Sequence, residues 1–214
     1  NDYLDQSSLN EDLYPLVKAI CERVKSEGDQ ALKAYNKELD KVDTPQLAIP
    51  FSELEAAFHR LDNNLREALQ HSHARIETYQ KSIKWTDQQG STECYEMYHP
   101  LERVGVYVPG GKASYPSTVL MTATLAKVAG VENITVVTPP QAGGLPDIVL
   151  AACYIAGVDY VFQVGGAQSI AALAYGTETI PKVDKIVGPG NQYVAYAKKY
   201  LFGQVGIDQI AGPS

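Results

Sequence analysis

The second half of the chain repeats one pattern, in which a short apolar run ends on glycine or proline and a longer apolar run follows. The short runs are typical of strands and the longer ones of helices. Strands and helices that alternate with short connections form a parallel sheet with helices on both faces, so the sequence predicts an α/β fold. The strands end at residues 108–111, 138–140, 164–166, 188–190 and 211–214, and the helices cover residues 118–129, 145–156, 167–175 and 192–202.

The first of these units, residues 104–130, has the sequence VPGG at the end of its strand. Tyr107 lies on the strand, and we expect Ser117 to cap a helix that begins near Thr118. Glycines allow close approach to the backbone of the turn, and the start of a helix offers unpaired N–H groups. Because parallel sheets bind ligands at the carboxyl ends of their strands, this edge is a predicted binding site. The alternative is a plain turn whose glycines serve backbone geometry only.

The first hundred residues have helical periodicity. We therefore expect residues 1–106 to form a helical amino-terminal portion and residues 107–214 to form the domain of alternating strands and helices. Within the first portion, residues 93–108 alternate in the way a strand pair would. Ser52 and Glu55 form a capping box for the last, long helix. The predicted helices cover residues 10–25, 29–39 and 53–83.

Charge and composition exclude several classes of partner. The 18 basic and 25 acidic residues give a net charge of −7, which leaves no basic surface for nucleic acid. Three widely spaced cysteines without a CxxC motif indicate reduced thiols. No apolar run reaches about 18 residues and no signal peptide is visible, so we expect a soluble, cytoplasmic protein without a membrane partner. The chain begins without methionine and stops directly after a strand end, so we expect part of a longer protein.

Two nucleotide-binding motifs are incomplete in this sequence. The phosphate-binding Walker A motif needs glycine where Val106 stands, and serine or threonine where Ala113 follows Lys112. The dinucleotide motif GxGxxG begins at Gly188 but has Tyr193 in place of its third glycine. The chain therefore matches neither an ATPase of the P-loop type nor a standard dinucleotide fingerprint.

The histidines do not form a metal site by their spacing. His71 and His73 are two residues apart on a predicted helix and point to different faces, while His59 and His99 are isolated. The sequence also contains no Ser/His/Asp set and no pair of carboxylates spaced for acid–base chemistry. We expect no metal-ligating or catalytic residue in this chain.

Four uncharged polar residues stand at or just after strand ends, namely Tyr107, Gln168, Asn191 and Ser214. In a parallel sheet these positions meet at one edge, where a tyrosine and two amides can contact nicotinamide, ribose or pyrophosphate. The alternative is that Gln168 and Asn191 only cap helices.

Long stretches of the sequence resemble the histidinol dehydrogenase family. They read ERVGVYVPGGKASYPSTVLMTATLAKVAGV, QVGGAQSIAALAYGTETIPKVDKIVGPGNQYV and IDQIAGPS, and EGDQALKAYNKELDK in the first half is similar to the same family. The resemblance covers at least residues 101–214. It implies that L-histidinol is oxidised to L-histidinal and then to L-histidine while two NAD are reduced in sequence. It also implies a zinc ion that holds the substrate and a homodimer that completes each site.

The resemblance further implies a fold and a set of site residues. The βα-repeat domain would be Rossmann-like, and the helical portion before it would belong to an incomplete second Rossmann-like domain. Tyr107, Gln168 and Asn191 match the family's NAD-contacting residues, and Ser214 matches its substrate-contacting serine. The family's zinc ligands and its Glu-His catalytic pair lie beyond the end of this chain, which would carry the cofactor side of the site.

Two other functions stay open at this stage. One is a different NAD-dependent alcohol or aldehyde dehydrogenase, for which Cys153 inside an apolar helical run is a poor nucleophile. The other is a non-catalytic dinucleotide-binding fragment.

Overall fold

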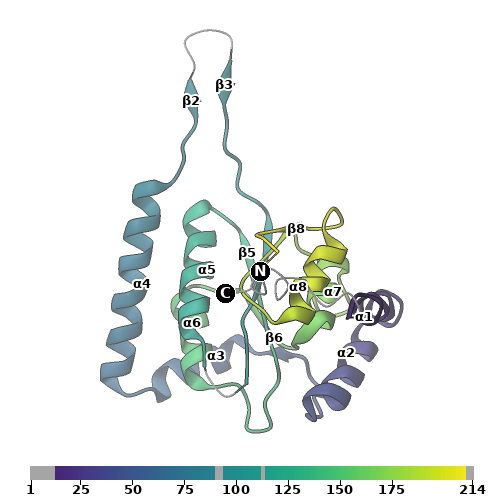
Figure 1. Cartoon of the computed structure of the whole chain (residues 1–214). Coiled ribbons are helices and arrows are strands. Elements are labelled where there is room, and N and C mark those ends of the chain that lie inside the picture. The colour runs from purple at the N-terminus through teal and green to yellow at the C-terminus, as the bar shows by residue number, and fades with distance from the viewer. Residues whose placement is uncertain (1–12, 90–93, 112–113, 211–214) are drawn as a thin grey trace, which may run out of the picture.

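A computed structural model describes residues 13–89, 94–111 and 114–210, and its centre is a six-stranded sheet (Figure 1). The strand order is β1-β6-β5-β4-β7-β8. Five strands run parallel, and the short β1 pairs antiparallel with β6 at one edge. The α/β fold predicted from the strand ends is confirmed. The strands are β1 (Ala48–Ile49), β4 (Arg103–Tyr107), β5 (Asn133–Thr138), β6 (Tyr160–Gln163), β7 (Lys185–Val187) and β8 (Gly206–Ile207).

Helices cover both faces of the sheet and enclose one apolar core on each side. Helices that connect parallel strands cover both faces of their sheet, and β5 is accordingly buried along nearly all its length. One face is covered by α3 (Phe51–Arg60), α4 (Asn63–Ile83), α5 (Pro116–Ala129) and α6 (Asp147–Ile155). The other is covered by α1 (Leu13–Glu27), α2 (Asp29–Tyr35), α7 (Gly166–Tyr175) and α8 (Gln192–Leu201).

Elements from the first hundred residues pack directly on the βα repeats. Helix α1 contacts α7 and α8, α3 contacts α6, and α4 contacts α5, while β1 adds a strand to the sheet. The division of the chain at residue 106 stays a prediction, and that position lies within β4. Among the described residues, no helix is both long and apolar enough to cross a lipid bilayer.

The single helix predicted over residues 53–83 is wrong, because the chain breaks between α3 and α4. Asp62 is extended there, and its side chain accepts a hydrogen bond from the backbone N–H of Leu65 at 3.0 Å, which starts a new helix. The predicted capping box is also wrong, since Pro50 occupies the N-cap of α3 and Ser52 lies in its first turn. The break lets the two helices pack against two different partners, α6 and α5.

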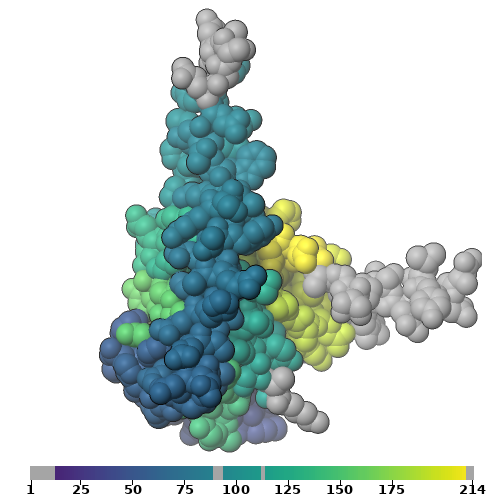
Figure 2. Space-filling model, turned by 90° about the vertical axis from the view of Figure 1, so that its left-hand side faces the viewer, coloured from purple at the N-terminus to yellow at the C-terminus, as the bar shows by residue number. Residues whose placement is uncertain are grey.

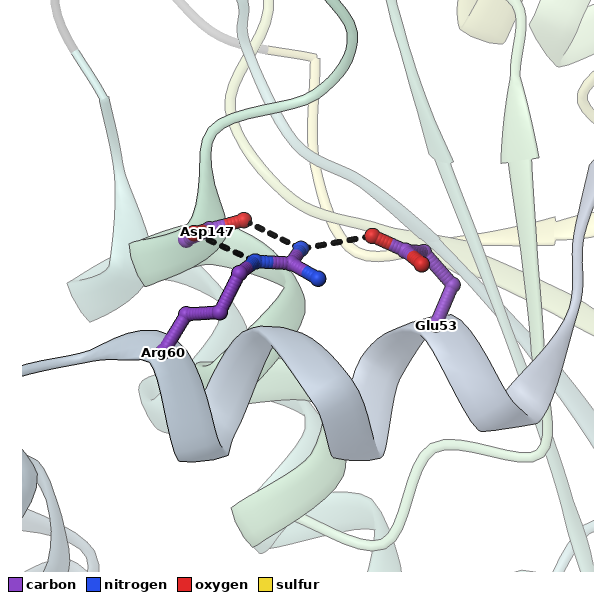
Figure 3. Close-up of polar contacts among 3 residues, drawn as sticks. All are labelled: Glu53, Arg60 and Asp147. Atoms are coloured by element: carbon purple, nitrogen blue, oxygen red, sulfur yellow. Dashed lines mark hydrogen bonds and ion pairs between the residues drawn. The ribbon is translucent and has the colours of Figure 1, made fainter.

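An arginine attaches α3 to the start of α6 (Figure 3). The Arg60 guanidinium donates to both carboxylate oxygens of Asp147, at 2.9 and 2.6 Å, and to Glu53 at 2.6 Å. Hydrogen bonding to Arg60 lowers the pKa of Asp147 below its ordinary value. The three side chains are partly exposed, so this contact orients the two helices without being buried.

Two further sequence predictions need correction. Helix α5 begins at Pro116 after an N-cap at Tyr115, so Ser117 is inside the first turn and caps nothing; proline suits this position because its missing N–H would be unpaired anyway. The strand pair predicted over residues 93–108 does not form, since its two strands have other partners. Strand β3 (Tyr95–Glu96) pairs with β2 (Gln88–Gln89) in a hairpin, and β4 joins the main sheet. The hairpin strands project beyond the body above α4 (Figure 2).

Candidate functional site

The strand order reverses direction between β4 and β7. From β4 the chain continues to β5 and β6 on one side and then returns to β7 on the other side of β4. The helices that follow β4 and β7 therefore lie on opposite faces of the sheet, the arrangement that favours a ligand-binding crevice at these two strand ends. This switch point is where open α/β sheets bind ligands. A cavity of about 260 Å³ lies beside the end of β7, lined by residues that include Gly188, Pro189, Gly190, Lys198 and Asp208.

Residues 188–190, which we call the Gly188 turn, pack tightly against β4. Gly188 has a positive φ of 109°, and a Cβ atom added to it would lie 2.3 Å from the carbonyl oxygen of Tyr107. A side chain is therefore excluded both by conformation and by contact. The close approach places the end of β7 directly against the end of β4.

Tyr107 turns its side chain into the core on the α7 side and is only 3% exposed. Its hydroxyl accepts a hydrogen bond from the backbone N–H of Gly166 at 3.4 Å. Burial raises the pKa of Tyr107 to about 12, and the nearby Asp40 carboxylate adds to that rise. The hydroxyl is therefore a neutral hydrogen-bonding group at the start of α7.

Gln168 lies in the first turn of α7 and is 2% exposed. Its side chain folds back beside Gly166, so the structure brings Gln168 and Tyr107 to the same turn. The N-cap of α7 is Gly165, without a capping side chain, so Gln168 is not a helix cap.

Asn191 lies at the other end of the edge, after the Gly188 turn. It is exposed and is the N-cap of α8, where its Oδ1 atom accepts from the Val194 backbone N–H at 3.2 Å. Asn191 therefore caps α8, and contact of its amide with a ligand stays a prediction. Ser214 lies outside the described residues.

Residues that sequence reasoning missed lie next to this edge. Asn36, fully buried in the π-helix η2 (Asn36–Asp40), donates to Thr44 Oγ1 at 2.7 Å and to the Gln163 carbonyl at 2.9 Å. It thereby ties η2 to the end of β6. Lys198 and Asp208 form an ion pair of 2.8 Å beneath the Gly188 turn. A detectable signal was the position of Lys198 on the buried stripe of α8.

The structure does not support a reactive cysteine or a metal site among the described residues. Cys153 is fully buried and burial raises its pKa to about 12, which excludes a reactive thiolate. Within the described part of the chain, no group of three or more His, Cys, Asp or Glu residues could hold a metal ion. These residues therefore do not fit a zinc site.

A larger apolar groove of about 930 Å³ lies between the end of α4 and α5, with Trp85, Leu101 and Leu125 among its lining residues. It also reaches Val131, just before β5, and Lys185 and Val187, at the two ends of β7. Because ligands of parallel sheets bind at the carboxyl ends, the crevice between β4 and β7 is the stronger candidate.

Comparison with known proteins gives one family throughout. The chain matches the sequence profile named histidinol dehydrogenase over residues 5–214. It is 78% identical over 212 residues to histidinol dehydrogenase of Staphylococcus saprophyticus, covering 99% of this chain and 50% of the relative. The Staphylococcus aureus (strain COL) protein is 68% identical over 216 residues, covering 100% of this chain and 52% of that protein.

Solved structures give the same result. The crystal structure of histidinol dehydrogenase from Elizabethkingia anophelis matches with a TM-score of 0.90 and 39% identity, covering 95% of this chain and 48% of that one. This chain therefore spans about half the length of the relatives that it matches.

Proposed function

Since the chain belongs to the histidinol dehydrogenase family, we propose that it forms the cofactor-binding half of an NAD-dependent enzyme. The whole enzyme would oxidise L-histidinol through L-histidinal to L-histidine, in histidine biosynthesis. The observation that carries the proposal is the reversal of strand order between β4 and β7, with a cavity and the Gly188 turn at the end of β7.

In this proposal Tyr107, Gln168 and Asn191 contact NAD. Asn191 is exposed beside the Gly188 turn, so its amide can meet the cofactor directly. Tyr107 and Gln168 are nearly buried, so a bound cofactor would reach them only at the glycine turn that precedes α7. None of the three carries a charge at neutral pH, which suits a cofactor that has to bind and leave twice for each product.

The NAD nicotinamide supplies the hydride acceptor when it is bound. The residues of this chain would bind and orient the cofactor, while glycine backbone at the strand ends would allow close approach. By the family resemblance, zinc and the catalytic Glu-His pair belong to the other half of the proposed enzyme. The described residues of this chain offer no donor set for a metal. We place Ser214 at the substrate by the family resemblance alone.

Assembly and location follow the same resemblance. We propose a homodimer in the cytoplasm, acting on a small-molecule substrate without nucleic acid or membrane as partner. The acidic net charge of −7 supports the absence of a nucleic-acid partner. A different dehydrogenase finds no support among the relatives named above. For the isolated chain, binding of the dinucleotide without turnover is the second candidate, and it is favoured by the lack of a metal-binding group within the described residues.

Titration calorimetry of the 214-residue chain with NAD tests the proposal, using variants that separate contact from capping. Asn191→Ala removes both the amide and the cap, whereas Asn191→Ser keeps a capping oxygen and removes only the amide. We expect both variants to weaken NAD binding about tenfold, the value of one lost hydrogen bond of about 1.4 kcal/mol.

Asp62→Ala is the matched control, because Asp62 caps α4 in the same way and lies on a helix that packs on the other face of the sheet. It should leave NAD affinity unchanged. If Asn191→Ser binds NAD with unchanged affinity, Asn191 serves only as a helix cap. If the unaltered chain does not bind NAD, the proposed cofactor site is contradicted.

A further inference from the structure

Lys198 is a buried charge in the last turn of α8. It is 4% exposed, whereas Lys199, the next residue, is exposed to solvent. Burial of an ammonium group costs several kcal/mol unless ionic and hydrogen-bond partners compensate. The position of Lys198 is therefore explained only by what its Nζ atom contacts.

Lys198 and its partner Asp208 both make hydrogen bonds to one residue, Gly188. Lys198 Nζ donates to Asp208 Oδ1 at 2.8 Å and to the Gly188 carbonyl oxygen at 2.6 Å. Asp208 Oδ2 accepts from the Gly188 backbone N–H at 2.9 Å. The ion pair thus binds both polar backbone groups of Gly188, at the carboxyl end of β7.

The residue held in this way forms the boundary of the crevice. Gly188 abuts the carbonyl of Tyr107, so its place fixes the spacing between the ends of β7 and β4. The cavity at this strand end is lined by Lys198 and Asp208 together with the Gly188 turn. Asn191 follows the turn directly and begins α8, the helix that carries Lys198.

We infer that Lys198 and Asp208 are a positioning pair, which holds the Gly188 turn against β4 and thereby sets the geometry of the cofactor-binding crevice. The part of this inference that concerns the cofactor rests on the proposed function. The part that concerns the turn does not, because it follows from contacts within the chain. A pair that served stability alone would leave the local opening of Gly188 and the affinity for NAD unchanged in a folded variant.

The test begins without cofactor, by amide hydrogen exchange measured with NMR. Lys198→Met keeps the aliphatic stem of the side chain and removes the ammonium group, and Lys199→Met is its matched control on the same helix. We expect the Gly188 amide to exchange at least tenfold faster in Lys198→Met than in Lys199→Met. The backbone N–H of Gln163 donates to the Leu47 carbonyl at 2.9 Å, at the opposite edge of the sheet. It should exchange at the same rate in both variants, which shows that the fold is intact.

Asp208→Asn provides a second variant should Lys198→Met not fold, because it removes the charge of the partner and keeps a hydrogen-bond acceptor. Equal Gly188 exchange in the folded variants and the control would overturn the positioning role.

NAD titration of the same proteins follows. An affinity about tenfold weaker in Lys198→Met than in Lys199→Met supports the link to the cofactor, and equal affinities overturn it. Failure of the unaltered chain to bind NAD would count against the proposed function and against the cofactor link, while the exchange data would still decide the role of the pair.

Discussion

At the scale of single residues, burial disfavours the charged form of the Asp40 carboxyl group. It ends η2, and burial raises its pKa from 3.8 to about 6. The folded chain therefore keeps a proton on Asp40 at pH values where the unfolded chain has lost it. It follows that stability falls as the pH rises from about 4 to about 6, and stays lower above that range.

Asp40→Asn should stabilise the chain at neutral pH, because an amide resembles the protonated acid and carries no charge to desolvate. We expect the free energy of unfolding in urea to rise by about 1 kcal/mol near pH 7.5 and to stay unchanged near pH 3.5. Asp43→Asn, at a nearby exposed aspartate, is the control and should change neither value. An equal gain at both pH values would contradict the pKa argument.

Because glycine or proline stands at each predicted strand end, the sequence predicted that Tyr107, Gln168 and Asn191 lie near these ends. The burial of Tyr107 was not predictable, since the elements next to its side chain, such as α7 and η2, are distant from it in sequence. The role of Lys198 was hidden for a related reason. Its partner Asp208 lies beyond β8, and only the fold brings it under the Gly188 turn.

At the scale of elements, strands were predicted better than helix boundaries. Four of the predicted strand ends fall at the ends of β4, β5, β6 and β7, while the fifth, at residues 211–214, lies outside the described residues and β8 ends at Ile207. By contrast, α3 and α4 share one apolar stripe that continues across their break. The signal for that break was Asp62, a capping residue inside the stripe. Strand β1 has only two residues, which is too short for any periodicity, and its pairing with β6 depends on long-range contact.

The junction between α3 and α6 gives a prediction at this scale. Arg60→Met should lower the melting temperature slightly, by at most about 3 °C, because partly exposed ion pairs contribute little. The folded-state pKa of Asp147 is lowered, so the contribution is present above the ordinary aspartate pKa and is lost as the pH falls through the lowered value. The difference between variant and parent should therefore vanish in acid.

Calorimetric scans of both proteins near pH 7 and near pH 2.5 measure this difference. Arg75→Met, at an exposed arginine on α4, is the control and should match the parent at either pH. A loss of the same size in acid would show that the aliphatic stem of Arg60, and not its charge, supports the junction.

At the scale of the whole molecule, helices from the first hundred residues cover both faces of a sheet that the second hundred residues build almost alone. Sequence periodicity identified most of these helices but could not show which face each one covers. Such packing depends on contacts between segments that lie far apart in the chain, for example α1 with α7 and α4 with α5.

The last prediction also concerns the whole molecule, because this chain spans about half the length of the relatives that it matches. We predict that the 214-residue chain binds no stoichiometric zinc and does not oxidise histidinol. Its described residues hold no group of metal-binding side chains, and the proposed catalytic pair belongs to the other half of the enzyme. Loss of a general base or of a metal each commonly costs a factor of about a hundred or more in rate.

Elemental analysis after dialysis and absorbance of NADH measure the two outcomes on the purified chain. The longer Staphylococcus saprophyticus relative, named histidinol dehydrogenase, is assayed in parallel as the positive control for histidinol oxidation. One tightly held zinc per chain, or histidinol-dependent NADH at a rate near that of the relative, would show that these residues contain a complete site. If instead the chain binds NAD and remains inactive, cofactor binding and chemistry are divided between the two halves of the enzyme, as the crevice between β4 and β7 leads us to expect.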